Sequence, residues 1–134
     1  MSLVRLRPSL FEGKYPKWGL KLITGQCVRY YPIFLDTAAA RILVSGADEA
    51  ATAKLRLLLK TEGQISVFGD HPTGEVLRWA EEGRLRHYTL PIEESDLDGA
   101  AMLYVAHSDG AERLVELAHK HGVLVNVVDT PALC

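Results

Sequence analysis

One stretch constrains the fold of this chain more than any other. An apolar run from Ile42 to Val44 meets a turn of small residues, Ser45-Gly46-Ala47, and a segment with helical spacing follows from Asp48 to Thr61. A buried strand that turns directly into a helix opens a βαβ unit, because parallel strands need a long crossover connection. We therefore expect a parallel sheet whose first buried strand is Arg41–Val44.

The rest of the chain repeats this alternation of strand and helix. The later predicted strands are Gln64–Phe68, Leu85–Leu90, Ala101–Ala106 and Val123–Val127. The later predicted helices are Glu75–Glu82 and Asp109–His121, with an acidic connector at Glu93–Asp98. Since such crossovers are right-handed, we predict a Rossmann-like, doubly wound α/β fold with a parallel five-stranded sheet in the order 3-2-1-4-5. A ligand crevice is then expected at the carboxyl ends of the strands, beside the first strand.

Helical spacing and glycines give two further expectations about the helices. The apolar face predicted for the first helix consists of Ala50, Ala53, Leu57 and Leu58. A glycine follows each of the three predicted helices, where the left-handed conformation commonly ends a helix. These glycines are Gly63, Gly83 and Gly122.

The composition excludes several classes of protein. The 134 residues are 48% hydrophobic and 24% charged, which is typical of a soluble globular domain. No apolar run approaches the roughly 20 residues that span a bilayer, so we expect no membrane contact. Cys27 and Cys134 fit neither a metal site nor a disulfide framework, and we expect reduced thiols in a cytoplasmic protein.

The N-terminal segment differs from the rest of the chain in charge. Residues 1–30 hold six basic residues and one acidic residue, whereas the remainder holds 9 basic and 16 acidic residues. Pro and Gly interrupt the basic segment and the acidic body would repel nucleic acid, so we expect no nucleic-acid partner. We predict a mostly irregular extension over residues 1–28, with a short strand at Leu20–Ile23. An irregular or edge segment at Arg29–Leu35 then leads into a single domain over residues 29–134.

The turn after the first strand departs from a dinucleotide-binding fingerprint. The fingerprint is G-x-G-x-x-G/A, and the chain has Ser45-Gly46-Ala47-Asp48-Glu49-Ala50. A side chain at a left-handed position costs roughly 1–2 kcal/mol, and we expect the Ala47 methyl and the Glu49 carboxylate to oppose a bound pyrophosphate. Residues 45–50 are nonetheless the predicted NAD-binding turn. Asp70, 24 residues after Gly46, is the predicted ligand of the ribose, or else only a turn residue.

Two further loops end at the predicted crevice. Asp129 follows the last strand, where a carboxylate either accepts a proton from a substrate or merely stabilises the Thr130-Pro131 turn. After the fourth strand, Ser108 offers a hydroxyl and Asp109 a helix N-cap. His107 is either a proton carrier or iron ligand at the crevice mouth, or a loop histidine without a function. Of the other histidines, we predict surface positions for His119 and His121 and find no metal-ligand spacing for His71 and His87.

From Tyr31 onward, the chain resembles the N-terminal domain of siroheme synthase. The resemblance covers about three quarters of the chain and rests on motifs in a consistent order: Tyr31-Pro-Ile-Phe-Leu-Asp36, Ala50 to Leu59, Trp79-Ala-Glu-Glu-Gly83, Asp96-Leu-Asp-Gly99 and Val125-Asn-Val-Val-Asp-Thr-Pro131. The Asn-Val-Val-Asp ending is the most specific of them. The family usually has Gly-Gly-Gly at positions 45–47 and tends to have Ala-Thr-Asp-Asp at positions 106–109, so this chain departs from the family at both loops.

This resemblance implies an activity. The family combines NAD-dependent precorrin-2 dehydrogenase with sirohydrochlorin ferrochelatase, so the implied substrates are a tetrapyrrole and ferrous iron, and Asp129 is the implied acid/base for both steps. A homodimer is also implied, although the family's dimerisation region lies beyond Cys134, where this chain ends. The alternative is a non-catalytic relative that keeps the fold, has lost NAD binding and acts as a tetrapyrrole- or partner-binding module.

Overall fold

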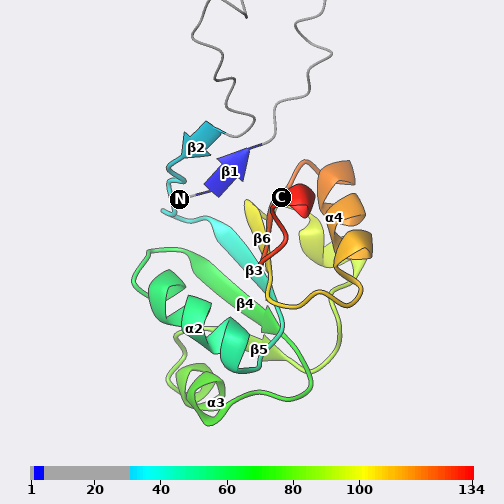
Figure 1. The fold of residues 1–134 in the computed structure, drawn as a ribbon. Helices are drawn as coiled ribbons and strands as arrows, with labels where there is room; N and C mark the ends of the chain where they lie inside the picture. Colours follow the sequence, from blue (N-terminus) through cyan, green and yellow to red (C-terminus); the bar gives the residue numbers. More distant parts are fainter. Residues whose placement is uncertain (1, 5–30) are drawn as a thin grey trace, which may run out of the picture. The chain divides into compact units, whose positions relative to one another are not determined.

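The structure is a computed structural model in which residues 2–4 and 31–134 are described, and the chain divides into two compact units, residues 1–34 and 35–134 (Figure 1). In the first unit, β1 (Ser2–Val4) and β2 (Tyr31–Ile33) form an antiparallel pair with Leu3 opposite Pro32. Apart from β1, the predicted irregular extension lies outside the described residues. The predicted strand at Leu20–Ile23 and the predicted domain boundary after residue 28 also lie outside them.

The second unit is built on a parallel five-stranded sheet. Its strands are β3 (Arg41–Ser45), β4 (Gln64–Phe68), β5 (Arg86–Tyr88), β6 (Met102–Val105) and β7 (Leu124–Val127). They lie in the order β5-β4-β3-β6-β7, which confirms the predicted order, and every neighbouring pair is parallel. The predicted fold class is therefore confirmed, with β3 in the centre of the sheet.

Helices cover the two faces of this sheet (Figure 1). The longer helices are α2 (Glu49–Leu58), α3 (Gly74–Glu81) and α4 (Ala111–Lys120), and the short 3-10 helices are η2 (Glu94–Leu97) and η3 (Pro131–Leu133). Alternate residues of β3 enter two separate hydrophobic clusters. Ile42 and Val44 pack with residues of α2 and α3, whereas Leu43 packs with residues of α4. The strand is thus apolar throughout because both of its faces are buried.

The face of α2 that meets the sheet differs from the predicted one. The buried residues are Ala51, Thr52 and Leu55, whereas Ala50, Ala53 and Leu57 are exposed. Consecutive residues of a helix lie about 100° apart around its axis, so an error of one residue rotates the predicted face by that angle. The large Leu57 suggested the wrong face, because a helix that crosses close over a strand needs small residues such as Ala51 at the contact.

The helix ends follow the predicted glycines in two of three cases. Gly83 and Gly122 adopt the left-handed conformation, with φ of 73° and 68°, and the amide of Val123 donates to the carbonyl of Ala118, as in a Schellman ending. The prediction for Gly63 is wrong, since α2 already ends at Leu58 and Gly63 has no positive φ. Close packing, rather than the end of a helix, requires a glycine at position 63, because an added Cβ would lie 2.8 Å from Ile42 Cδ1.

Two predicted element limits are also corrected. The third strand covers only Arg86–Tyr88 of the predicted Leu85–Leu90, because only those residues pair with β4. Helix α4 begins at Ala111, and its N-cap is Gly110 with φ 72°. Asp109 is therefore not the N-cap of α4.

Candidate functional site

Gly46 is the residue that shapes the turn after β3. Its φ is +111°, and an added Cβ would lie 3.3 Å from Ala106 Cβ and 3.6 Å from His107 Cδ2. Ser45 and Ala47 are not among the residues with positive φ. The strain expected from replacing two glycines is therefore absent, because the turn places its left-handed conformation on the glycine that the chain has kept.

The methyl group of Ala47 is directed into the core. Ala47 is 3% exposed and belongs to the cluster beneath α2. Gly69 makes room for it, since a Cβ on Gly69 would lie 2.9 Å from both the Cβ and the N atom of Ala47. The expectation that this methyl obstructs a pyrophosphate is wrong, because the methyl points into the core, where the glycine at position 69 leaves room for it.

The first turn of α2 carries the two predicted carboxylates. Asp48 is the N-cap and accepts a hydrogen bond from the amide of Ala51 at 3.2 Å. Glu49 lies 3.4 Å from the guanidinium of Arg56, which also bonds Glu75 at 2.6 Å. The hydrogen bond from Arg56 is the main reason that the pKa of Glu75 is lowered. Each carboxylate of the turn therefore has a partner on α2.

A pair of threonines, one of them buried, fixes this turn to α3, and the sequence analysis missed them. Thr52 is fully buried, and its hydroxyl donates to the carbonyl of Asp48 at 2.8 Å. Thr73 is the N-cap of α3, and its hydroxyl lies 2.8 Å from the Thr52 hydroxyl. Since Thr52 has already donated its proton, Thr73 is the donor to Thr52. The pattern Thr73-x-x-Val76 before a helix was the available signal for this cap.

A cavity of about 410 Å³ opens at the carboxyl ends of the strands, next to this turn. Of the predicted site residues, Ser45, Gly46, Asp70 and His107 line it together. The predicted residues that do not line it are Ala47, Asp48, Glu49, Ala50, Ser108 and Asp129. Arg113, on the first turns of α4, adds a cation to its wall that the sequence analysis did not consider. The cavity is therefore the crevice expected beside the central strand.

Ser45 and His107 join the two strands that border this crevice. The Ser45 hydroxyl lies 2.6 Å from His107 Nε2, and Ser45 is only 7% exposed. His107 Nδ1 donates to the carbonyl oxygen of Asp109 at 2.8 Å. His107 is thus held on both ring nitrogens, and Asp109 contributes a backbone carbonyl.

Asp70 is paired with a neighbouring histidine. His71 Nδ1 lies 2.8 Å from Asp70 Oδ1, and the two side chains are 87% and 79% exposed. Their hydrogen bond is the main reason that the pKa of Asp70 is lowered and the pKa of His71 is raised. Asp70 is the second residue after β4 and lines the crevice, and its role as a ribose ligand stays a prediction.

Asp129 stands apart from the crevice, after β7. It is exposed and left-handed, with φ 55°, and it has no hydrogen-bond partner among the residues that the structure describes. Aspartate tolerates this conformation better than most residues. Hydrogen bonds hold the residues on either side of Asp129. The amide of Val127 donates to Cys134 Sγ at 3.3 Å, and the Thr130 hydroxyl donates to the carbonyl of Val128 at 3.2 Å.

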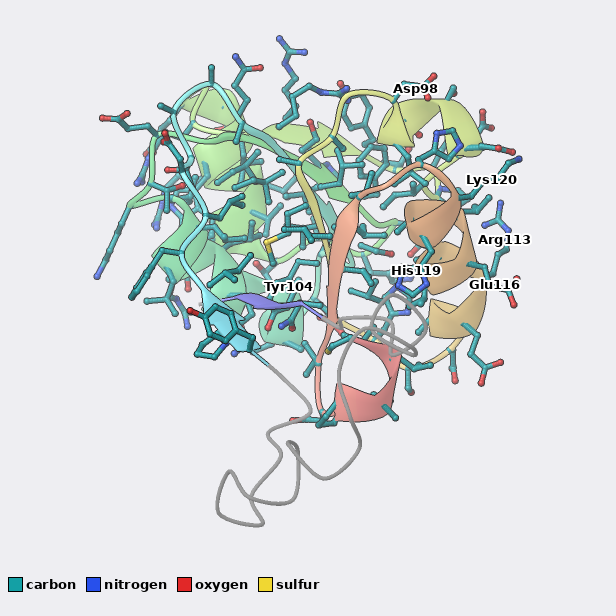
Figure 2. All side chains as sticks on the ribbon, turned by 90° about the horizontal axis from the view of Figure 1, so that it is seen from above. Asp98, Tyr104, Arg113, Glu116, His119 and Lys120 are labelled. Carbon is teal, nitrogen blue, oxygen red and sulfur yellow. The ribbon has the colours of Figure 1, made fainter. Side chains whose placement is uncertain are left out.

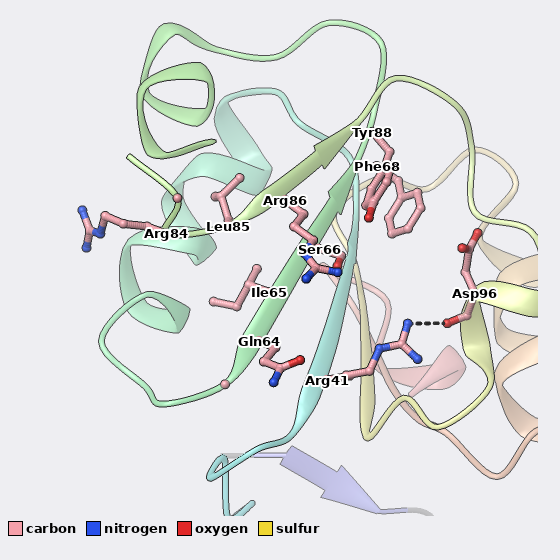
Figure 3. Close-up of a pocket in the computed structure, with 12 residues that line it drawn as sticks. Arg41, Gln64, Ile65, Ser66, Phe68, Arg84, Leu85, Arg86, Tyr88 and Asp96 are labelled. Atoms are coloured by element: carbon pink, nitrogen blue, oxygen red, sulfur yellow. Dashed lines mark hydrogen bonds between the residues drawn. The ribbon is translucent and has the colours of Figure 1, made fainter. Parts of the chain in front are cut away.

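A second cavity, of about 370 Å³, runs along β4 and β5, from their first residues to Phe68 and Tyr88 at their ends (Figure 3). Arg41, Gln64 and Arg86 are the first residues of β3, β4 and β5, and all three line it. Arg41 donates to the backbone carbonyls of Asp96 and Asp98, at 3.2 and 2.5 Å, which fixes the connector that crosses to the other half of the sheet. None of the predicted site residues lines this basic cavity, whereas ligand sites of doubly wound folds lie beside the turn after the first strand, so this cavity is not the candidate site.

The outer side of α4 holds charged residues, among them Arg113, Glu116 and Lys120 (Figure 2). His119 is exposed as predicted, whereas the surface prediction for His121 is wrong. His121 is 21% exposed and lies between Glu94 at 3.0 Å and Asp98 at 3.1 Å. Hydrogen bonds from Lys120 and, next, His121 lower the pKa of Glu94. These contacts fasten η2 to the end of α4.

Neither a metal-binding cluster nor a membrane-spanning helix is present among the described residues. No set of three or more His, Cys, Asp or Glu side chains within residues 2–4 and 31–134 is arranged to hold a metal ion. In the same part of the chain, no helix has the length and apolar character needed to cross a bilayer.

The parallel sheet and the glycine turn at its central strand define residues 35–134 as a Rossmann-like domain of the dinucleotide-binding class. A family model described as "Putative NAD(P)-binding" matches residues 33–134. The chain belongs to this family, and specifically to the N-terminal domain family of siroheme synthase, which confirms the resemblance described above.

Individual relatives agree with this assignment. Siroheme synthase of Pseudoalteromonas atlantica is 38% identical over 110 residues, covering 80% of this chain and 24% of that protein. Siroheme synthase of Methylobacillus flagellatus is 39% identical over 108 residues, covering 77% and 22%. A solved structure titled "SirC, precorrin-2 dehydrogenase" matches with a TM-score of 0.60 and 25% identity, over 73% of this chain and 49% of that one. The chain thus spans about a quarter of the length of these siroheme synthases.

Proposed function

We propose that this domain binds NAD(P) in the crevice beside β3 and takes part in the oxidation of precorrin-2 to sirohydrochlorin. The observation that carries the proposal is the turn itself. Gly46 has the left-handed conformation and lines the crevice, whereas the Ala47 methyl is buried in the core. Such turns allow a pyrophosphate to approach the backbone closely. The names of the siroheme synthase relatives and of the precorrin-2 dehydrogenase structure support the same function.

The residues around the crevice fit a dinucleotide. The turn from Ser45 to Ala50, of which Ser45 and Gly46 line the crevice, would hold the diphosphate, and Asp70 would accept hydrogen bonds from a ribose. His107 and Ser108 would complete the cofactor-binding set on the side of β6. Arg113 adds a positive charge that favours an anionic ligand in the same cavity.

The proposed reaction divides between cofactor and protein. Bound NAD⁺ would supply the acceptor for one hydride. Asp129 would accept the proton that leaves the macrocycle, so that precorrin-2 and NAD⁺ give sirohydrochlorin, NADH and one proton. An exposed carboxylate without a partner in the described part of the chain is available for this transfer. Asp129 would likewise accept pyrrole protons if ferrous iron, as a substrate, enters sirohydrochlorin.

Two further parts of the proposal concern the setting of the reaction. We place the activity in the cytoplasm, where the free thiol of the buried Cys134 would stay reduced. The homodimer implied by the family stays a prediction, which sedimentation velocity of the purified chain would measure.

The test is a titration of the purified full chain with NADH and with NADPH, followed by nicotinamide fluorescence. We expect a dissociation constant below about 1 mM for at least one of them, within the usual range for enzyme substrates. An anaerobic assay with precorrin-2 and NAD⁺ then follows the NADH that is formed. Binding weaker than about 1 mM for both dinucleotides would favour the non-catalytic relative instead. Binding without oxidation of precorrin-2 would contradict the dehydrogenase part of the proposal.

A further inference from the structure

The hydrogen bonds of His107 fix which of its ring nitrogens carries a proton. The Asp109 carbonyl, 2.8 Å from Nδ1, can only accept, so Nδ1 must carry a hydrogen. In a neutral imidazole the other nitrogen, Nε2, then has none. The Ser45 hydroxyl, 2.6 Å from Nε2, must therefore be the donor of that bond.

This arrangement decides what Ser45 can offer to a ligand. Ser45 and His107 both line the crevice, and the His107 ring packs over the turn, 3.6 Å from the point where a Cβ on Gly46 would lie. Because the only hydroxyl proton of Ser45 is donated to His107, its oxygen can only accept from a ligand. Phosphate oxygens are acceptors as well, so a neutral His107 leaves two acceptors facing each other.

Protonation of His107 reverses the bond. Nε2–H then donates to the Ser45 oxygen, and the freed Ser45 hydroxyl can donate to a phosphate oxygen. The imidazolium also brings a positive charge next to the anion, which is the state that a nearby negative charge favours. We propose that the diphosphate of a dinucleotide binds in this crevice together with one proton from solvent, which is held on His107 Nε2.

The proposal rests on the function proposed above and makes cofactor affinity depend on pH. The other charged groups that line the crevice are Asp70 after β4, Asp109 beside His107 and Arg113 on α4. Two other histidines lie next to the crevice: His71, paired with Asp70, and His87, whose Nε2 lies 2.8 Å from the carbonyl oxygen of Gly69.

Calorimetry can count this proton. The full chain is titrated with NADH at several values between about pH 6 and 8, where histidines titrate, in buffers of different ionisation enthalpy. We expect uptake that approaches one proton per site, with affinity that falls up to about tenfold per pH unit in that window. His107→Gln should abolish the uptake and Ser45→Ala should reduce it, whereas His71→Gln should leave it unchanged.

Three outcomes would overturn the inference: no proton uptake by the unaltered chain, uptake that survives His107→Gln, or uptake that disappears in His71→Gln alone. If NADH does not bind even near pH 6, the proposed function fails, and inorganic pyrophosphate becomes the probe for the inference. Pyrophosphate should then raise the titration midpoint of His107 in NMR spectra of the full chain. An unchanged midpoint at saturating pyrophosphate would overturn the inference by itself.

Discussion

The turns that follow β3 and β7 carry the proposed cofactor site and the proposed proton acceptor, and they are built in different ways. At the turn after β3, three side chains have partners: Ser45 bonds His107, Ala47 packs against Gly69, and Asp48 caps α2. After β7, Asp129 is exposed at φ 55° and bonds to none of the described residues.

Because of this difference, we expect substitutions in the two turns to have different effects. The β3 turn is held by contacts to other strands and helices, so a substitution there should change stability and cofactor affinity together. The conformation of Asp129 is a property of its own backbone, and its carboxylate bonds to none of the described residues. A substitution that preserves this backbone should therefore change activity alone, and the predictions below test that division.

The largest effect is expected at Asp129. Asp129→Asn removes the proton acceptor and keeps a side chain that tolerates the left-handed conformation, so the rate of precorrin-2 oxidation should fall about 10²–10⁴-fold. The free energy of unfolding should change by less than about 0.5 kcal/mol, and NADH affinity should not change. The measurements are anaerobic turnover, urea denaturation and NADH titration of both proteins.

Asp129→Gly is the matched variant for the backbone. It should lose activity to the same extent while gaining about 1 kcal/mol of stability, because glycine adopts positive φ without a steric cost. If either variant turns over at the unaltered rate, the role of Asp129 as proton acceptor is wrong.

The next largest effect is expected at Gly46. Gly46→Ala puts a side chain at φ +111° and 3.3 Å from Ala106 Cβ, which should cost about 1–3 kcal/mol of stability and lower NADH affinity. Gly74→Ala is the control, since an added Cβ there meets nothing within 4 Å and no positive φ is required. Equal thermal stability of the two variants would show that the turn does not depend on Gly46.

A smaller effect on stability alone is expected at the threonine pair. Thr52→Val keeps the shape of a fully buried side chain but removes the bonds to Asp48 and Thr73, which should cost about 1–2 kcal/mol. Thr61→Val removes a hydroxyl that bonds the Leu58 carbonyl at an exposed position, so it should cost less than half as much. If chemical denaturation gives the two variants the same loss of stability, the threonine pair does not hold the turn.

The fold was predictable from sequence because its determinants are local. The apolar run Ile42–Val44 and its counterparts mark buried strands, and the right-handed crossover rule converts their order along the chain into the order in the sheet. The contacts that complete the site are not local. Gly69 compensates for Ala47 across 21 intervening residues, and Ser45 meets His107 across 61.

Single residues also misled the sequence analysis where two physical explanations fit one pattern. Asp109 before a helix fits an N-cap, but its carbonyl bonds His107 and Gly110 supplies the helix start. Asp129 before Thr130-Pro131 fits an ordinary turn former, and only the backbone angles reveal its left-handed conformation. A substituted fingerprint was therefore a poor guide to the geometry of the turn, although a good guide to its position.

The smallest effect is expected at the exposed pair of Asp70 and His71. The Asp70 carboxylate raises the pKa of His71, so the titration midpoint of His71 in NMR spectra should lie above the ordinary value of about 6.5. Asp70→Asn should return it to that value, whereas Asp109→Asn should leave it unchanged.

A raised pKa of His71 in the folded state means that the pair stabilises the fold below about pH 6.5 and loses this contribution as the pH rises through the raised value. Because the lowered pKa of Asp70 keeps its carboxylate charged down to below about pH 3.9, the pair is complete in mild acid and is lost as the pH rises through the raised pKa of His71. An unshifted midpoint for His71 would show that no such pair forms in solution, and Asp70 would then be free for a ribose at every pH.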